Sequence, residues 1–549
     1  MIKKLIGFAA FLFICNSALR AQSESFQVPL SWHMLDPIHD SVYGVSANRT
    51  YSELLKGKTG QKVIVGIVDS GADTLQEDLK DVLWHNPKEI PNDHQDNDKD
   101  GYVDDYYGWN FLGGKSDTSN VTEDTRESTR YYFQYKSQFE NIKDSNQVPQ
   151  KERVHYRTWI QAKNIELTAT DAAKEAGALE RISSLLPQIS DFSKVLLKDT
   201  FNLEDVKAYE PIDRKTSAEK QIYTILLDKV GPGTTNITLP AKINSLLDSL
   251  KEVNKLPDVA PPNYRQNIVK DNYDDFNDKY YGNDNISAGD VMHGTHVSGI
   301  IGASRNNNLG MDGIADNVAL IEVRTVPGSG DEHDKDVALA IRYAVDHGAK
   351  VINMSFGKPI SPNRSWVEGA IRYAQQHDVL LVHAAGNDGE DITGQPNYPT
   401  QYYGPDNSKE FDNVITVGAS GAMEDDLVAD FSNFSKTAVD VFAPGVEIYS
   451  TLPGKDNYGS LSGTSMASPV VAGVAAAIRS YYPELSAPEV KQLIMASVTK
   501  INFPVINPAT GEKVKLSDLC VTGGIVNLYN AIKMMQDHQF SLKKTPGQK

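Results

Sequence analysis

The alternation of short apolar runs with helical patterns is the feature that most constrains the fold of this chain. The runs are rich in Val, Ile and Leu, which is typical of strands buried on both faces of a parallel sheet. Apolar residues also recur at helical spacing over residues 334–347, 366–376 and 465–481. We therefore predict an α/β fold with a doubly wound, mostly parallel sheet. The predicted strands cover residues 63–68, 318–326, 351–356, 379–382 and 414–417.

A long region, residues 115–285, interrupts this alternation. Its strand signal is weak and its apolar residues follow helical spacing, with Pro187 and the glycines around Pro232 separating the patterns. We predict a large helical insertion, a hairpin or a small bundle, within an α/β domain formed by residues 22–114 and 286–539. The apolar positions that define these helices are Leu179, Ile182, Leu186, Ile222, Ile225, Leu226, Val230, Ile243, Leu246, Leu247 and Leu250.

The first 21 residues have the features of an export signal. Lys3 and Lys4 precede a short apolar stretch, and Ala21 supplies the small residue before a cleavage site. No later stretch is long and apolar enough to be a transmembrane helix. We therefore expect an exported protein, extracellular or periplasmic, without an integral membrane segment in the mature chain. Residues 540–549 are expected to form a polar tail.

The net charge limits the molecules that the chain is expected to bind, and the cysteine content limits its disulfides. The formal net charge is −18, which disfavours nucleic acids and anionic membranes and suits calcium binding. Of the two cysteines, only Cys520 lies beyond the predicted signal, so the mature chain forms no internal disulfide. The length of 549 residues exceeds what one ordinary core holds and favours two or three structural units.

The strand predicted at residues 63–68 ends in a polar turn, Asp69-Ser70-Gly71. Ligands of open α/β sheets bind beyond the carboxyl ends of the strands, where a carboxylate can orient a neighbouring imidazole. On its own, an aspartate in such a position is more often a solvated turn residue.

A second motif, His293-Gly-Thr-His296-Val-Ser-Gly299, begins with a histidine at a glycine-flanked helix start. His296 lies one helical turn further along the same side. The two histidines also admit a metal site, but the glutamate of the helical zinc-peptidase pattern is absent. We interpret His293 as the reactive imidazole and His296 as a packing and hydrogen-bonding residue.

Two further polar residues lie where an oxyanion can be stabilised. Ser465 belongs to the block Ser462-Gly-Thr-Ser465-Met-Ala-Ser-Pro469, in the first turn of an apolar helix. The free N–H groups and partial positive charge of such a turn favour a developing anion. Asn387 follows the strand predicted at residues 379–382. Taken alone, the block is also compatible with an ordinary helix cap, and the asparagine with a turn residue.

Together these motifs resemble the subtilisin-like serine peptidases, in which the catalytic residues follow the chain order Asp, His, Ser. The resemblance implies that Asp69 orients His293, and that His293 takes the proton of Ser465. Ser465 would then attack the peptide carbonyl. Asn387 and the backbone N–H of Ser465 would hold the oxyanion of the tetrahedral intermediate.

The resemblance, which covers about residues 32–114 and 289–535, also implies a cleft for protein or peptide substrates in extended conformation. Residues 328–330 would pair with the substrate backbone, an interaction that selects backbone more than sequence. Two other segments would form the walls of the first specificity pocket, with Asn397 near its base. The implied substrate-binding residues are Gly328, Ser329, Gly330, Ser355, Phe356, Gly357, Ala385 and Gly386.

An acidic loop over residues 96–105 resembles the first part of an EF-hand calcium loop. Its five carboxylates repel one another without a cation. Tyr107 replaces the bidentate glutamate of the twelfth position, and a solvated turn is the alternative. We predict calcium as a cofactor, with Asp96, Asp98, Asp100, Tyr102 and Asp104 as its ligands.

These features favour a secreted serine endopeptidase of broad specificity. The second hypothesis is a dedicated processing peptidase whose helical insertion selects one partner protein. The third is an inactive scaffold that binds extended peptides. The joint presence of Asp69, His293, Asn387 and Ser465 argues against inactivity.

Overall fold

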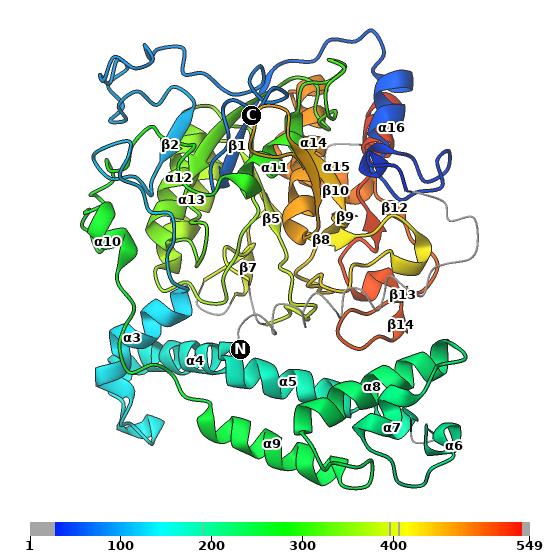
Figure 1. Cartoon of the computed structure of the whole chain (residues 1–549). Coiled ribbons are helices and arrows are strands. Elements are labelled where there is room, and N and C mark those ends of the chain that lie inside the picture. Colours follow the sequence, from blue (N-terminus) through cyan, green and yellow to red (C-terminus); the bar gives the residue numbers. More distant parts are fainter. Residues whose placement is uncertain (1–27, 190–191, 395–396, 405–406, 541–549) are drawn as a thin grey trace. The chain divides into compact units, whose positions relative to one another are not determined.

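The computed structural model describes residues 28–189, 192–394, 397–404 and 407–540 (Figure 1). The predicted signal, residues 1–21, and the predicted tail beyond residue 540 lie outside these ranges. The chain divides into two compact units. Unit 1 comprises the described residues up to Asp124 and from Asn263 onward, and unit 2 is Thr125–Pro262.

A nine-stranded sheet forms the centre of unit 1. Neighbouring strands run parallel, apart from one antiparallel pair at an edge. This arrangement confirms the predicted mostly parallel sheet. In spatial order the strands are β12 (Thr499–Lys500), β15 (Gly524–Ile525), β9 (Val441–Pro444), β8 (Val414–Ser420), β5 (Leu380–Ala384), β4 (Val351–Met354), β1 (Val63–Asp69), β3 (Val318–Arg324) and β2 (Gly108–Asn110).

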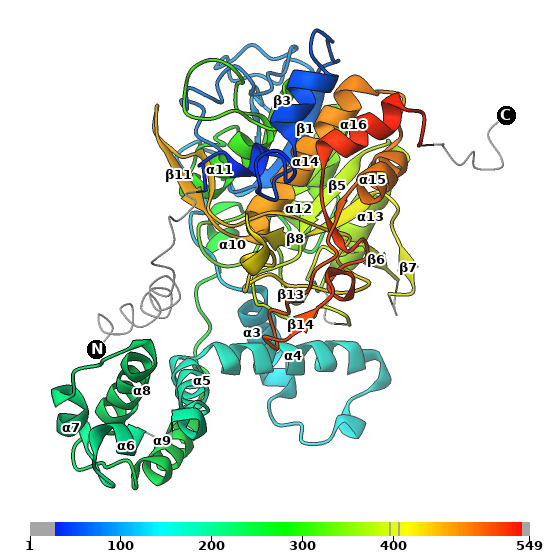
Figure 2. The same ribbon diagram turned by 90° about the vertical axis from the view of Figure 1, so that its right-hand side faces the viewer.

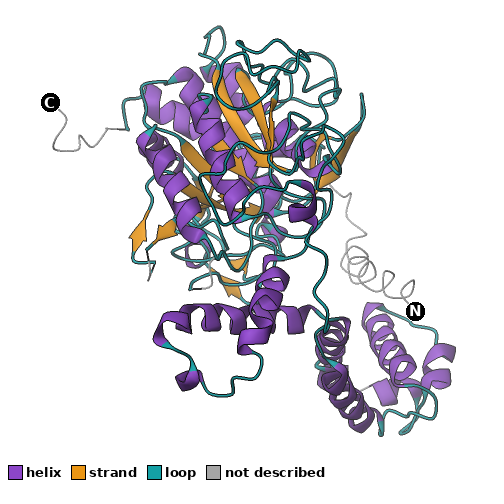
Figure 3. Ribbon diagram, turned by 90° about the vertical axis from the view of Figure 1, so that its left-hand side faces the viewer, coloured by secondary structure: helices purple, strands orange, loops and turns teal. Residues whose placement is uncertain are grey.

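Helices cover both faces of this sheet, which confirms the predicted doubly wound α/β fold (Figure 3). Val68 and Ile352 point to one face, and Val65 and Ile67 point to the other. Because both faces are buried, the central strands are mostly apolar. The helices are α12 (Asp334–Asp346) and α13 (Arg364–Gln376) on the first face, and α11 (Met292–Gly302), α14 (Thr464–Tyr481), α15 (Ala487–Ala496) and α16 (Leu528–Gln536) on the second.

The predicted and observed elements differ mainly at their ends. β3 ends at Arg324, before the predicted end at residue 326, and α13 begins at Arg364, two residues before the predicted start. Pro469 is buried inside α14 as its sixth residue, where its missing N–H removes one helical hydrogen bond. The short strands β2 and β9 were not predicted.

Smaller elements complete unit 1. No helix among the described residues is long and apolar enough to cross a membrane. The short helices are α2 (Ala47–Arg49) and α10 (Tyr264–Ile268), and the two-stranded sheets pair β6 (Tyr402–Tyr403) with β7 (Lys409–Glu410), β10 (Ile448–Thr451) with β11 (Tyr458–Leu461), and β13 (Val505–Ile506) with β14 (Lys513–Val514).

Unit 2 is built of helices (Figure 2). It has an apolar core of its own. Phe192, Leu226 and Ile243 lie in that core, and Trp159 is buried where the first two long helices pack together. The predicted helical insertion between Asp69 and His293 is thus confirmed as a feature of the fold. Its helices are α3 (Glu127–Phe139), α4 (Arg153–Ala169), α5 (Asp171–Ser183), α6 (Phe192–Leu196), α7 (Leu203–Ala208), α8 (Arg214–Val230) and α9 (Leu239–Val253).

Both ends of the predicted insertion, residues 115–285, belong to unit 1. Asn283 holds them there, because its Nδ2 donates to Asn120 Oδ1 (3.0 Å) and to the carbonyl of Gly114 (3.2 Å). Asn110, at the end of β2, donates in turn to Asn283 Oδ1 (3.0 Å). The compact helical unit is therefore shorter at both ends than the predicted segment.

Candidate active site

The predicted site residues follow the carboxyl ends of neighbouring strands. β1 lies between β3 and β4, so the order of the strands reverses around it, and ligands of open α/β sheets bind beyond the strand ends at such a point. Asp69 ends β1, Ser355 follows β4, and Asn387 follows β5. The first turns of α11 and α14 bring His293 and Ser465 to the same unit.

Asp69 and His293 form a hydrogen bond of 2.7 Å between Oδ1 and Nδ1. The backbone N–H of Ser70 donates to the same carboxylate oxygen (2.7 Å). The Asp69 side chain is buried and that of His293 is 36% exposed. This contact occupies Nδ1 of His293, so Nε2 is the ring nitrogen that can accept a proton.

Two glycines allow α11 to approach the end of β1 this closely. Gly71 has φ +89°, a left-handed conformation, and a Cβ there would lie 2.0 Å from the carbonyl of Ile286. A Cβ on Gly294 would lie 2.1 Å from the carbonyl of Gly71. The glycines that flank Asp69 and His293 in the sequence are therefore required by the approach of the two segments.

The environment of His293 raises its pKa above the ordinary value. Burial acts in the opposite direction and lowers the pKa, because it disfavours the charged imidazolium. The negative charge of Asp69 and the hydrogen bond to it outweigh the burial, and Asp290 adds a smaller effect of the same sign. The imidazole is thus prepared to accept a proton.

Ser465 is the second residue of α14, where the backbone N–H groups have no partner within the helix. Its hydroxyl donates to the carbonyl of Ser355 (2.9 Å), and the hydroxyl of Ser355 donates to the carbonyl of Ser465 (2.8 Å). The described geometry therefore directs Ser465 Oγ at a backbone acceptor of the segment after β4, and not at His293.

Asn387 is oriented by the residue before Ser465. Its Oδ1 accepts hydrogen bonds from the backbone N–H of Thr464 (2.8 Å) and from the Thr464 hydroxyl (2.9 Å). Because the oxygen is used in this way, the amide nitrogen is directed elsewhere and its two N–H groups can serve an anion. The geometry suits the predicted oxyanion donor.

Asn353 links β4 to α14 and was not predicted. Its Nδ2 donates to the hydroxyl of Ser355 (2.9 Å), and its Oδ1 accepts from the hydroxyl of Ser468 (2.8 Å). All three side chains are buried. These contacts of Asn353 support the segments around Ser465. The signal for them in the sequence was an asparagine within an otherwise apolar strand.

The segment 328–330 is held by residues that precede unit 2 in the chain. The N–H of Gly328 donates to the carbonyl of Thr122 (2.8 Å), and the N–H of Asp124 donates to the carbonyl of Ser329 (2.9 Å). Asp124 also contacts His333 through Oδ2 and Nε2 at 2.9 Å, and both side chains are buried. No sequence pattern indicated this supporting contact, because the partners lie about 200 residues apart.

The predicted pocket walls lie on either side of Asn397. A Cβ on Gly357 would lie 2.3 Å from Asn397 Nδ2, and a Cβ on Gly386 would lie 3.4 Å from the same atom. Asn397 Nδ2 also donates to the carbonyl of Ala384 (3.2 Å). The two walls and the predicted base of the pocket therefore meet at this amide.

His296 is buried in α11 and makes a contact of 3.2 Å from Nε2 to the carbonyl of Gly459. Burial lowers the pKa of His296 to about 4, so the ring is neutral at pH 7. This environment suits the packing role that we expected for it.

The acidic loop gathers oxygen atoms that lack hydrogen-bond donors. Oxygens of Glu89, Asp96 and Asp98 lie within 4.8 Å of one another. Glu89 Oε2 and Asp98 Oδ1 are buried and have no hydrogen-bond partner among the described residues. Asp96 Oδ2 accepts from the N–H of Gly101 (2.9 Å), which closes the turn. Glu89 was not predicted because it precedes the acidic run.

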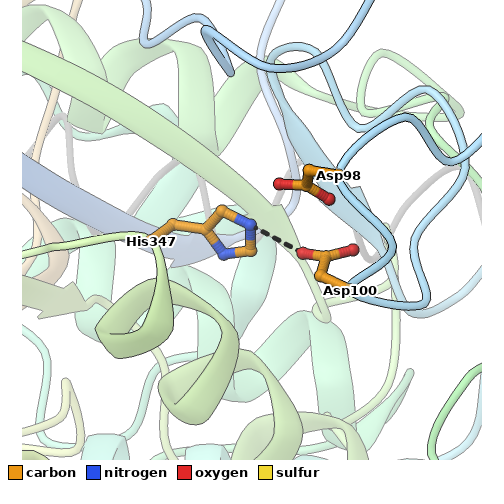
Figure 4. A group of neighbouring side chains, drawn as sticks. All are labelled: Asp98, Asp100 and His347. Carbon is orange, nitrogen blue, oxygen red and sulfur yellow. Dashed lines mark ion pairs between the residues drawn. The ribbon is translucent and has the colours of Figure 1, made fainter.

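Asp98 and Asp100 also face His347, at the end of α12 (Figure 4). His347 Nε2 lies 3.0 Å from Asp100 Oδ2 and 3.4 Å from Asp105 Oδ2, and its Nδ1 lies 2.8 Å from the carbonyl of Tyr343. Burial lowers the pKa of His347, but the two carboxylates outweigh it and raise the pKa to about 10.

Two of the five predicted calcium ligands lie apart from these groups. The carboxylate of Asp104 accepts from the backbone N–H groups of Asp93 (3.2 Å) and His94 (2.6 Å). The ring of Tyr102 is buried between Trp109 and Tyr343. The loop therefore uses Asp104 to close a turn, and Glu89 takes a place in the oxygen cluster.

Comparisons with known proteins show which family this chain belongs to. The model of the family described as "Subtilase family" matches residues 60–513. The chain is 39% identical over 240 residues to the thermophilic serine proteinase of Bacillus sp. (strain AK1), which covers 44% of this chain and 52% of that protein. It is 36% identical to the cell wall-associated protease of Bacillus subtilis (strain 168), over 43% of this chain and 24% of that protein. It is 37% identical to thermitase of Thermoactinomyces vulgaris, over 48% of this chain and 85% of that protein. The chain thus spans about half of the first relative and about a quarter of the second.

Proposed function

This chain belongs to the subtilase family, and from that premise we propose that it is an exported serine endopeptidase that acts through an acyl-enzyme intermediate. The observation that carries the proposal is the hydrogen bond of 2.7 Å between Asp69 and His293. The same unit holds Ser465 at a helix start and Asn387 with its amide nitrogen available. A nucleophile, a base, a residue that orients the base and an oxyanion donor are the parts that acyl transfer requires.

The reaction begins when the Ser465 hydroxyl leaves the carbonyl of Ser355 and turns toward His293. Oγ then forms a bond to the scissile carbonyl carbon while its proton moves to His293 Nε2. The C–N bond breaks as the imidazolium returns this proton to the leaving amine. A water molecule then gives a proton to the same ring and attacks the acyl carbon. The ester C–O bond breaks, and the imidazolium returns the proton to Ser465 Oγ. Asp69 keeps the proton on Nδ1 and stabilises the imidazolium in both halves.

The oxyanion of each tetrahedral intermediate is bound by two donors. One is the backbone N–H of Ser465, in the first turn of α14, and the other is Nδ2 of Asn387. Thr464 fixes the amide in advance, so little reorganisation is needed when the charge develops. The hydrogen bonds between Thr464 and Asn387 connect the two segments that carry these donors.

The substrate would lie extended along residues 328–330, with its first side chain between the walls at residues 355–357 and 385–386. The supporting contacts of Thr122 and Asp124 hold the first of these segments in place. Backbone pairing of this kind accepts many sequences. We infer a peptide or protein substrate outside the cytoplasm, with the N-terminal residues acting as export signal.

Calcium is part of this proposal, with a ligand set centred on Glu89, Asp96 and Asp98. The donors are all hard oxygens, which calcium prefers. Burying two carboxylate oxygens without a hydrogen-bond donor is costly unless a cation is bound. Calcium would supply charge compensation that holds the loop together, and it takes no part in the chemical steps.

Removal of calcium is expected to lower the thermal stability of the protein. A cation that binds only the native state adds about 2.7 kcal/mol at a hundredfold excess over its Kd. Melting of the full chain in calcium and in chelator measures this increment. Asp98→Asn should abolish most of the increment, and Asp81→Asn, a change of an exposed acid outside the acidic loop, should keep it. Equal melting temperatures in calcium and chelator would contradict the site.

Labelling by a fluorophosphonate tests the proposed function. The probe reacts with an activated serine, so we expect one modified peptide that contains Ser465, in a protein that also hydrolyses casein. Heat-denatured protein serves as the control and should remain unlabelled. Casein hydrolysis without modification of Ser465 would overturn the assignment. Absence of both signals in folded protein would favour a scaffold that binds extended peptides.

A further inference from the structure

Glu322, in β3, is a buried carboxyl group beneath the helix that carries His293. Its exposed fraction is 0%, in a strand that is otherwise apolar up to Arg324. β3 pairs with β1 so that Glu322 lies opposite Ile67, and Arg324 lies opposite Asp69. Paired residues of neighbouring strands point to the same face, and so do residues two apart along a strand. Glu322 and Asp69 therefore share the face that α11 covers.

Each of these two carboxyl groups has one oxygen with a partner and one without. Glu322 Oε1 accepts from the hydroxyl of Ser298 in α11 (2.7 Å), and Asp69 Oδ1 is used by His293 and Ser70. Glu322 Oε2 and Asp69 Oδ2 are both buried and have no hydrogen-bond partner among the described residues. The spacing and rise of strands put the Cα atoms of a diagonal pair roughly 8 Å apart, within reach of a glutamate side chain.

Glu322 and Asp69 are both acidic, and their proximity favours the protonated form of Glu322. Two ionised carboxylates in one dry place repel strongly, and Asp69 already has the imidazole of His293 as its partner. Burial raises the pKa of Glu322 to about 8, and the neighbouring Asp69 charge acts in the same direction. Glu322 is therefore protonated at pH 7 and has an O–H group to donate.

We propose that Glu322 is a positioning residue of the catalytic centre, whose protonated Oε2 donates to Oδ2 of Asp69, directly or through one water. The hydrogen bond would fix the rotation of the Asp69 carboxylate, and with it the orientation of His293. Ser298 would hold the other oxygen of Glu322 from α11, so that the helix with His293 and the strand with Asp69 are joined beneath the site. The inference rests on the proposed function, because it assigns a role within the same reaction.

The other groups that face Glu322 are few. From β1 the titratable group is Asp69, whose charge acts on Glu322, and α11 brings the hydroxyl of Ser298. Gly108 of β2 lies opposite Glu322 and brings no side chain. On β3 itself, Arg324 donates to Asn110 and to the carbonyl of Val121, and burial lowers its pKa to about 10. A titration of Glu322 would thus act mainly on the Asp69–His293 pair.

Glu322→Gln and Glu322→Leu separate the hydrogen bond from packing. The amide of glutamine keeps a neutral donor, so we expect kcat close to that of the wild type. Leucine removes the donor, and kcat should fall about 10- to 100-fold with KM unchanged, because a hydrogen bond to a charged group is lost. Leu320→Val, a smaller side chain in the same strand and on the same face, is the control for packing and should keep kcat. Equal kcat values for the Gln and Leu variants would overturn the proposal.

The pH dependence of stability gives a readout that does not require activity. The pKa of Glu322 is raised on folding from 4.5 to about 8, so the folded state binds this proton more tightly than the unfolded state. Its stabilising effect is complete below pH 4.5 and is lost as the pH rises through 8. The melting temperature of Glu322→Gln minus that of the wild type should therefore increase between pH 5 and pH 8. A constant difference would overturn the proposal even in an active enzyme. An increasing difference in a folded protein without peptidase activity would reject the proposed function and retain the protonated carboxyl.

Discussion

Replacement of Ser465 by alanine is expected to lower kcat for peptide hydrolysis by roughly 10⁶-fold, which is the cost of removing the nucleophile of a serine-peptidase triad. The side chain contributes one donated hydrogen bond, to the carbonyl of Ser355, so the fold should be retained. Hydrolysis of a chromogenic tetrapeptide by wild type and variant measures the ratio. A residual rate of about 10³- to 10⁴-fold over water can remain, because the oxyanion donors and the binding cleft are intact.

Ser460→Ala is the matched control for this substitution. Ser460 is exposed in β11, five positions before Ser465, and the change removes the same hydroxyl group. It should leave kcat and KM unchanged. Near-wild-type hydrolysis by purified Ser465→Ala protein would reject the nucleophile assignment. Loss of activity in both variants would show that the β11–α14 segment is sensitive to any change.

The apolar runs predicted the central strands because residues buried on both faces leave a continuous signal in the sequence. β1, β4, β5 and β8 were found in this way, and β3 differed only at its end. β2 (Gly-Trp-Asn) and β9 (Val-Phe-Ala-Pro) are short and carry few such residues, so they left no comparable signal. β2 pairs with β3, and β9 pairs with β8. A local sequence pattern does not contain information about such partners.

The predicted site residues share one property that a sequence reveals. Asp69 ends a strand, Asn387 follows one, and His293 and Ser465 lie in the first turns of helices. Local patterns in the sequence therefore predicted their positions. The groups that support them were not predicted. Asn353 and Glu322 lie inside strands, where one polar residue among apolar ones gives no information about its partner.

In the acidic loop, too, the sequence did not reveal which residues contact one another, although they lie close together in the chain. Spacing in the sequence assigned Asp104 to calcium, whereas its carboxylate binds the backbone of Asp93 and His94. Glu89 joins Asp96 and Asp98 because the chain folds back before the acidic run. Polar loops have no periodicity, so their internal contacts follow from three-dimensional structure alone. The compact helical unit likewise begins at Thr125 and ends at Pro262, positions that no local pattern marks.

Replacement of Arg265 by methionine is expected to lower the free energy of unfolding of unit 1 by about 3–5 kcal/mol. The guanidinium is buried and donates to both oxygens of Asp336 (2.9 and 2.7 Å) and to Asp271 (2.5 Å). Lys335 and Tyr281 complete the cluster, at 2.7 Å from Asp271 and 2.6 Å from Asp336. Methionine fills similar space but leaves the carboxylates without their main counter-charge. Denaturant unfolding monitored by tryptophan fluorescence measures the loss.

Two further variants separate this effect from a general loss of packing. Arg372→Met changes an exposed arginine in α13 and should cost less than about 1 kcal/mol. Combining Arg265→Met with Asp336→Asn should cost less than the sum of the single changes, because the second change removes a charge that the first left unpaired. The cluster joins the chain that returns from unit 2 to the start of α12, just after residues 328–330. Additive losses, or an Arg265→Met protein as stable as the wild type, would mean that the cluster is not needed to hold that return segment against the sheet.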